Sequence, residues 1–129
     1  MILLRSFCRD DGGDVVSDWY QQMEGRPKAR ARLDNRMMYL RQQPREGWVR
    51  PIYDTLRDGV GEVRFEIERI LYRPIGFFGP GRNEFTFLIF ATKTNRFDPV
   101  NAIDVAVDRK NAALKNPQRI VTMTRWGVK

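Results

Sequence analysis

Three strand-like segments joined by short links constrain the fold of this chain more than any other feature. They cover residues 61–67, 70–78 and 84–94. Apolar side chains alternate in the first segment, as expected for a strand with one buried face. Residues 84–92 are nearly all apolar or β-prone, which is typical of a central strand buried on both faces. Because the links are so short, we predict an antiparallel meander in which the three strands are neighbours.

Helical patterns lie on both sides of this meander. A short apolar run over residues 2–7 predicts a first strand, and Ser17 or Asp18 would cap a helix that begins at Trp19. A second helix is expected over residues 27–43, where Pro27 suits the first turn. Its apolar stripe consists of Ala29, Leu33, Met37 and Leu40. This spacing favours a buried helix face.

The C-terminal third predicts one more helix. Asp98 and Pro99 would begin it, and Asn116-Pro117 would end it. Its expected apolar side consists of Val100, Ile103, Val107 and Leu114. Residues 48–58 show no clear period, and residues 117–129 form a tail or an edge strand. We therefore predict one α+β domain over residues 1–129, with two N-terminal helices packed on a four- to five-stranded, mostly antiparallel sheet and a further helix near the C-terminus.

Composition excludes several classes of function. The chain has 129 residues, no histidine and a single cysteine, Cys8. A Ser-His-Asp triad and a Cys/His zinc site are therefore excluded, and so is an intrachain disulfide. No apolar run approaches the roughly 20 residues that a membrane helix needs. We expect a cytoplasmic protein without a metal or a small-molecule cofactor, in which Cys8 is a free structural thiol.

Positive charge indicates the class of partner. The formal net charge is +7 and the sequence pI is about 10.1, so we expect attraction to nucleic acid, to a ribosome or to an acidic protein. Arginine supplies most of the basic residues, and its planar fork suits phosphate. Arg30, Arg32, Arg36 and Arg41 edge the second predicted helix. They form either a solvated face or a surface for RNA or a protein partner.

Three further cations lie on neighbouring strands of the meander. Arg64, Arg73 and Lys93 can converge on one face of the sheet and form an anion site, and RNA phosphate is the expected anion. The alternative is structural. Arg64 would then pair with Glu62, Glu66 or Glu84. Arg73 would pack on Tyr72 or Trp48, and Lys93 would be an ordinary residue at a strand end.

The order of these segments resembles the RelE/ParE superfamily of toxins, and in particular its HigB-like, phage-derived branch. The resemblance rests on Glu62-Val63-Arg64 in one strand, Tyr72-Arg73 in the next and Phe90-Ala91-Thr92-Lys93-Thr94 in the third, with Pro99 following. It covers roughly residues 17–115. Two features depart from the family pattern: Thr92-Lys93 replaces a lysine pair, and only Trp126 occupies the region of a late Tyr or His.

The resemblance implies a type II toxin that cleaves mRNA on the ribosome and is silenced by an acidic antitoxin. Arg64 and Arg73 would then stabilise the transition state of 2′-hydroxyl attack, and Lys93 would act as general base or as a third clamp. The residues expected to bind RNA are Arg30, Arg36, Arg41, Arg82 and Arg96.

Other functions remain open on the same scaffold. One is a phage or prophage protein that binds a host or virion partner without catalysis, for which residues 76–81 offer an exposed aromatic turn, unless Phe77 and Phe78 fold into the core. Others are a gyrase-directed toxin and a nucleic-acid-binding module without catalysis.

Overall fold

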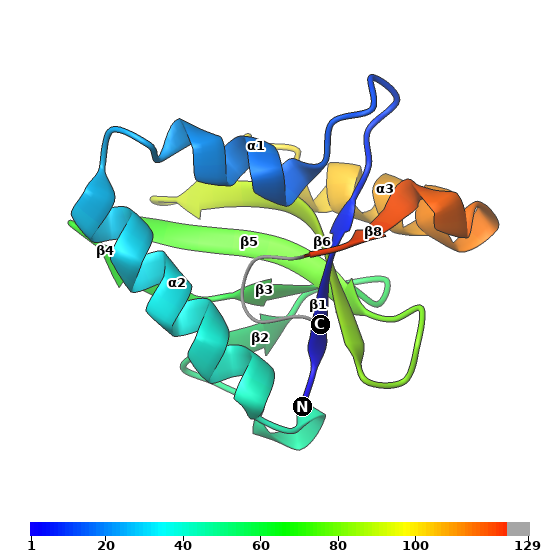
Figure 1. Cartoon of the computed structure of the whole chain (residues 1–129), viewed down its shortest axis with the longest axis horizontal. Helices are drawn as coiled ribbons and strands as arrows, with labels where there is room; N and C mark the ends of the chain where they lie inside the picture. The colour runs from blue at the N-terminus through cyan, green and yellow to red at the C-terminus, as the bar shows by residue number, and fades with distance from the viewer. Residues whose placement is uncertain (124–129) are drawn as a thin grey trace.

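The computed structural model describes residues 1–123, in which three α-helices pack on one mixed sheet (Figure 1). The strands are β1 (Leu3–Phe7), β2 (Tyr53–Thr55), β3 (Gly61–Val63), β4 (Phe65–Ile67), β5 (Ile70–Phe78), β6 (Glu84–Lys93), β7 (Phe97–Asp98) and β8 (Ile120–Thr122). The helices are α1 (Val15–Gln22), α2 (Pro27–Gln42) and α3 (Ala102–Lys115), and the single 3-10 turns are η1 (Arg45–Gly47) and η2 (Pro117–Arg119). The α+β class is confirmed.

The sheet is larger than predicted. Its main order is β2-β3-β5-β6-β1-β8, while β4 extends the pairing along β5 and β7 pairs with β6. All pairs are antiparallel except β1 with β6. The expected meander of residues 62–67, 70–78 and 84–93 is confirmed, although its first strand is broken at Arg64 into β3 and β4. The aperiodic segment 48–58 supplies the unpredicted strand β2.

The turn between β4 and β5 has the geometry of a tight hairpin. Glu68 and Arg69 both have positive φ, at 52° and 69°. Positive φ at both central residues defines the type I′ turn, whose twist matches that of the flanking strands. This link forms a tight hairpin even though it lacks the usual Asn-Gly or Asp-Gly pair, which agrees with the short links predicted for the meander.

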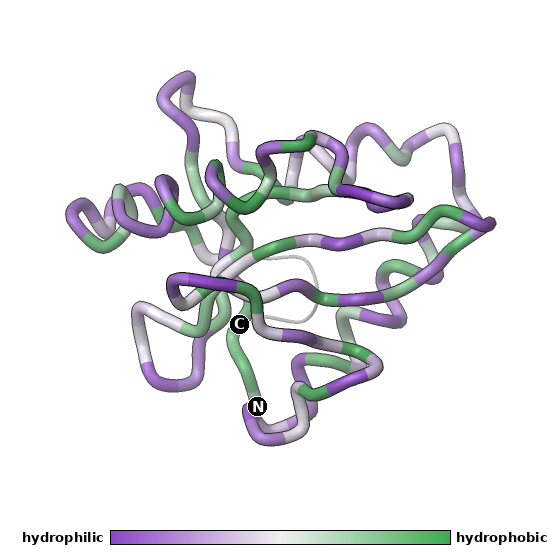
Figure 2. The backbone as a smooth tube through the Cα atoms, turned by 180° about the vertical axis from the view of Figure 1, so that it is seen from behind, coloured by the Kyte–Doolittle hydropathy of each residue, from purple (hydrophilic) through white to green (hydrophobic). Residues whose placement is uncertain are grey.

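Helices α1 and α2 cover one face of the sheet, and α3 covers one end of the other face (Figures 1 and 2). Trp19 of α1 stacks on Phe90 of β6 with ring centroids 4.1 Å apart, and its edge contacts Tyr72 of β5. The predicted apolar stripe of α2 is completely buried, which confirms it as core. The strands β3, β4 and the start of β5 lie beyond the end of α3.

The ends of two helices differ from the predictions. Helix α1 begins at Val15 because Asp14, not Ser17 or Asp18, accepts the cap hydrogen bond, from the Ser17 amide at 3.0 Å. Helix α3 begins at Ala102 because Asp98 is held in β7 opposite Thr92.

The buried side of α3 also differs from the predicted apolar side. Val100 and Leu114 are 67% and 50% exposed, whereas Ala102, Ala106 and Ala113 are buried. These small side chains let the helix approach the sheet closely. Among residues 1–123, no helix is long and apolar enough to cross a membrane.

Candidate anion site on the open face of the sheet

Arg64, at the break between β3 and β4, lies opposite Arg73 of β5. Glu62 pairs with Ile75 and Phe65 pairs with Tyr72, and this constant register places Arg64 across from Arg73. The rings of Phe65 and Tyr72 stack on the side of the sheet that carries the N-terminal helices, with centroids 5.4 Å apart. Successive side chains alternate between faces, so the two arginines point to the opposite side.

This side contains a solvent-open cavity of about 340 Å³. Its lining residues are Arg50, Pro51, Arg64, Phe65, Glu66, Leu71 and Arg73. Helix α3 covers the other end of the same face and leaves these strands accessible (Figure 2). The cavity therefore gathers three guanidinium groups on an uncovered part of the sheet.

Arg73 forms the base of the cavity. Its residue is 7% exposed, and Nη1 donates to the carbonyl oxygens of Tyr72 at 2.7 Å and Phe65 at 3.4 Å. Its Nε has no hydrogen-bond partner. Burial, followed by repulsion from Arg64, lowers the pKa of this guanidinium from its usual value. None of the ion pairs among residues 1–123 includes Arg73, so its positive charge is held in place by carbonyls and is not neutralised by a salt bridge.

Arg64 is held by a carboxylate beneath it. Its Nη1 lies 2.7 Å from Oε2 of Glu62, which is 2% exposed. The structural alternative for Arg64 is therefore confirmed for Glu62, whereas Glu84 pairs with Arg5 at 3.0 Å. The second carboxylate oxygen, Oε1 of Glu62, is buried without a partner. A buried carboxylate needs its cation, so this pair fixes the position of the Arg64 fork.

Lys93 lies apart from the two arginines. Its ammonium sits 4.7 Å from the ring centroid of Phe97, and Lys93 is absent from the cavity lining. The register of β5 with β6 places it across from Leu71, which does line the cavity. The structure thus brings two of the three predicted cations together and leaves the third at the margin.

Arg50 completes the cavity and was not predicted as a site residue. Its Nη2 pairs with Asp54 of β2 at 2.6 Å, and this hydrogen bond is the main reason that the pKa of Asp54 is lowered. Both residues lie in the aperiodic segment 48–58, where no strand was predicted. Without that strand, nothing in the sequence places Arg50 beside Arg64.

The five arginines expected to bind RNA occupy different environments. Arg36 is exposed on α2, and Arg82 and Arg96 are exposed in loops. Arg30 is half-buried, with its guanidinium carbon 3.9 Å from the Tyr20 ring centroid. Arg41 is only 7% exposed, so its predicted place on a basic rim of the second helix is wrong, and the rim is shorter than expected.

Helix α2 and strand β4 border a separate groove of about 440 Å³. Its lining residues are Arg32, Asn35, Arg36, Tyr39, Glu66 and Ile67. Tyr39 is 51% exposed there. This groove contains two arginines of the predicted rim on successive turns of one helix.

The aromatic segment 76–81 does not form an exposed turn. Phe77 is 3% exposed, and Phe78 packs edge-on against Trp48, Tyr53 and Phe85. The hypothesis of an adhesive loop is therefore wrong, and the alternative in which both rings fold into the core is confirmed. Burial in this cluster raises the pKa of Tyr53 to about 12.

Metal chemistry has no evident site in the part of the chain that the structure describes. Residues 1–123 contain no cluster of three or more Cys, Asp or Glu side chains able to hold an ion. The groups available in the cavity are guanidinium forks and carboxylates. Such a set can bind an oxyanion, stabilise developing negative charge and transfer a proton.

The chain matches no family model, no curated protein and no solved structure.

Proposed function

We propose that this protein is a toxin of the RelE/ParE type that cleaves mRNA on the ribosome, with the Arg64–Arg73 cavity as its active site. The observation that carries the proposal is the cross-strand pair Arg64 and Arg73 in one open cavity, with Arg73 outside any salt bridge of the described residues. The order of two helices, a meander and a third helix, together with the quoted motifs, supports the family assignment. The net charge of +7 suits an RNA substrate.

The chemistry needs no cofactor. The RNA 2′-oxygen attacks the adjacent phosphorus, the bond to the 5′-oxygen breaks, and the products are a 2′,3′-cyclic phosphate and a 5′-hydroxyl. Negative charge grows on the phosphoryl oxygens during this step. Fixed guanidinium groups stabilise that charge better than water does, because they need no reorganisation. Arg73 is held by two carbonyls and Arg64 by Glu62, so both forks are preorganised.

Proton transfer is assigned to the carboxylate of Glu66 and the ammonium of Lys93. Glu66 lines the cavity and is exposed, so it can accept the proton of the 2′-hydroxyl. Lys93, beyond Leu71, would protonate the leaving 5′-oxygen or clamp a phosphate. This arrangement departs from the lysine pair of the family pattern, in which Lys93 was expected beside the arginines.

The test is inducible expression in bacteria of the wild-type protein, Arg73→Ala and the control Arg57→Ala. Arg57 is exposed, and its ion pairs with Asp58 and Asp104 lie outside the cavity. We expect growth arrest from the wild type and from Arg57→Ala. Arg73→Ala should relieve it, since loss of one preorganised donor costs about 10²–10³ in rate. Circular dichroism of the purified variants would confirm that each is folded.

Arrest that persists in the folded Arg73→Ala variant would contradict RNA cleavage at this site. It would favour the second candidate function, a scaffold that acts by binding a protein such as gyrase or a host or virion component. A specific observation favours that candidate: Lys93 lies on Phe97, and Arg64 is already neutralised by Glu62. A binding surface tolerates both features, whereas catalysis needs the positive charge of the cavity to be available to the phosphate.

An acidic antitoxin is the proposed partner that silences the toxin in the cytoplasm. The groove between α2 and β4 carries Arg32 and Arg36 beside exposed Tyr39, and Glu66 is shared with the active-site cavity. A partner seated there would reach the edge of the catalytic cavity. Charge complementarity predicts tighter association at 0.05 M than at 0.5 M salt. A pull-down from the host that recovers no small acidic protein at either salt would contradict this proposal.

A further inference from the structure

A second arginine-lined cavity lies outside the candidate active site. It has a volume of about 460 Å³ and lies between the turn that joins β1 to α1 and helix α3. Its lining residues are Phe7, Arg9, Asp10, Asp11, Asp108, Arg109, Ala112 and Arg119. No motif in the sequence pointed to it, because its arginines come from three distant segments.

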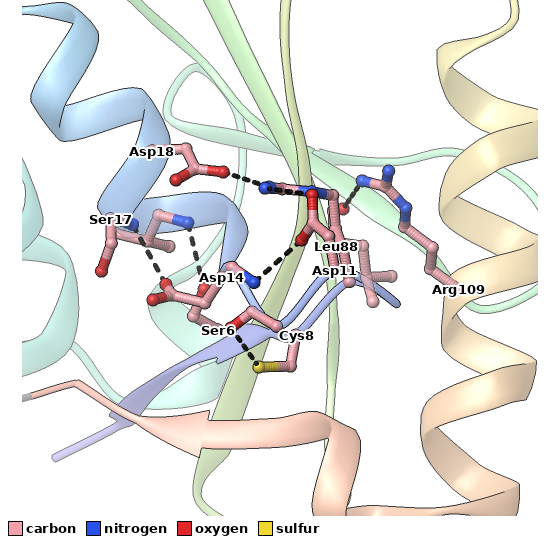
Figure 3. Close-up of polar contacts among 12 residues, drawn as sticks. Ser6, Cys8, Asp11, Asp14, Ser17, Asp18, Leu88 and Arg109 are labelled. Atoms are coloured by element: carbon pink, nitrogen blue, oxygen red, sulfur yellow. Dashed lines mark hydrogen bonds and ion pairs between the residues drawn. The ribbon is translucent and has the colours of Figure 1, made fainter.

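The cavity has an aromatic floor with cations above it. Phe7 is 2% exposed, and the guanidinium carbons of Arg109 and Arg119 lie 5.6 and 4.7 Å from its ring centroid. Arg109 reaches from α3 and donates to the Leu88 carbonyl at 2.8 Å (Figure 3). Arg119 donates to the Cys8 carbonyl at 2.8 Å. Both forks are therefore held in place from below.

Three arginines and three aspartates line this cavity, but their ion pairs are unevenly distributed. Arg9 pairs with Asp11 and Asp18, and Arg119 pairs with Asp10 at 2.9 Å. None of the ion pairs within residues 1–123 includes Arg109. Burial, followed by repulsion from Arg9 and Arg119, lowers the pKa of Arg109. An added anion would reduce the repulsion between this half-buried cation and its two cationic neighbours.

The carboxylate partner of Arg119 is weakly held. The side chain of Asp10 is 96% exposed, so its ion pair contributes little and is easily exchanged. An incoming phosphate can replace this carboxylate on Arg119 and bind Arg109 at the same time. Two guanidinium groups anchored against one buried ring can together bind a phosphate.

We propose that the Phe7–Arg109–Arg119 cavity binds a phosphate of a single-stranded RNA, as a contact separate from the cleavage site. The inference takes its ligand class from the proposed function, but it concerns binding and not cleavage. The two cavities share no lining residue, so one RNA strand would contact them at separate points. The second cavity would thereby orient the strand relative to the first.

The test measures the fluorescence anisotropy of a labelled 12-nucleotide RNA as purified protein is added. The titration is repeated at salt concentrations from 50 to 300 mM. All proteins carry Arg73→Ala, so that no cleavage occurs. Arg109→Gln should weaken binding about tenfold and reduce the salt slope by about 0.7, the value for one phosphate contact on a single strand. The control Lys115→Gln removes the same charge from an exposed position on the same helix and should change neither quantity by as much.

A second pair of variants tests the same proposal in case Arg109→Gln fails to fold. Asp10→Asn removes the exposed carboxylate that competes with phosphate for Arg119, so RNA binding should strengthen about threefold. The control Glu24→Gln neutralises an exposed carboxylate after α1 and should have a smaller effect on RNA binding. Equal effects within each pair would overturn the inference. If the variants within each pair bind RNA equally well but growth arrest still depends on Arg73, this inference fails and the proposed function stands. If RNA binding changes as expected in the Arg109 and Asp10 variants but the wild type causes no growth arrest, the proposed function fails and this inference stands.

Discussion

Ser6 and Asp14 show how single side chains connect the first strand to the first helix. The Ser6 hydroxyl, which is fully buried, accepts from the Val16 amide at 3.0 Å, and Asp14 accepts from the Ser17 amide (Figure 3). These bonds satisfy two amides at the helix start that have no partner within the helix. Burial would raise the pKa of Asp14, but hydrogen bonds from Ser17 and Ser6 outweigh it and lower the pKa below 3.8.

Asp14→Ala should therefore destabilise the fold by about 1 kcal/mol at pH 7, the usual cost of a lost N-cap. Because the folded pKa of Asp14 lies below its unfolded value, the stabilisation by its charge is complete above about pH 4. It is lost as pH falls through the folded pKa. Urea unfolding of both proteins at pH 7 and pH 2.5 would measure this. A difference in unfolding free energy that stays the same at both pH values would contradict the role of the ionised cap.

At the same scale, the sequence predicted the arginine pair but not its surroundings. Strand alternation was enough to place Arg64 and Arg73 on one face, since each lies between residues of the opposite face. The environments of Lys93 and Arg41 depend on contacts with Phe97 and on helix burial, which alternation does not determine. The Cys8 thiol is free, as expected, with Sγ 3.5 Å from the Gly12 carbonyl oxygen.

Among the elements, the pairing of β5 with β6 depends on a glycine. The register shifts between Ile75 and Gly76, where the pairing has a bulge or irregularity. A Cβ at Gly76 would lie 2.2 Å from the Thr86 carbonyl oxygen and 2.6 Å from the Phe85 ring. Both groups belong to the buried core, so neither can move away cheaply.

We expect Gly76→Ala to lower the free energy of unfolding by about 2–3 kcal/mol, as overpacking does in a closed core. Gly25→Ala is the matched control, because a Cβ there meets no atom within 4 Å. Thermal unfolding followed by circular dichroism would compare the two with the wild type. Similar midpoints for both variants would show that the sheet can relax around Gly76.

Element type was predictable where the pattern was long and regular. The meander and the buried stripe of α2 repeat over enough residues to outweigh local exceptions. Strand β2 has three residues, and its tertiary pairing with β3, not its own pattern, determines it. The start of α3 was misplaced because Asp98-Pro99 fits a helix start locally, whereas β6 holds Asp98 in a strand.

On the scale of the whole molecule, the fold carries two separate arginine-lined cavities. Strand β1 and helix α3 contribute to the lining of the second cavity, whereas β4 and β5 contribute to that of the first. The edge position of β8 agrees with the expectation for residues 117–129, of which those after 123 lie outside the described residues. Trp126 is among them. The sequence alone could not bring Arg9, Arg109 and Arg119 together, because only tertiary packing joins their segments.

If Arg64 and Arg73 stabilise 2′-hydroxyl attack on an RNA phosphate, the ends of cleaved mRNA must depend on Arg73. The most direct measurement is the chemistry of mRNA fragment ends from cells that express the wild type or folded Arg73→Ala. This mechanism predicts 2′,3′-cyclic phosphate and 5′-hydroxyl ends within translated regions for the wild type, and at least 100-fold fewer such ends for Arg73→Ala. Fragments with 5′-phosphate ends, or equal numbers of cyclic phosphate ends from both proteins, would contradict it.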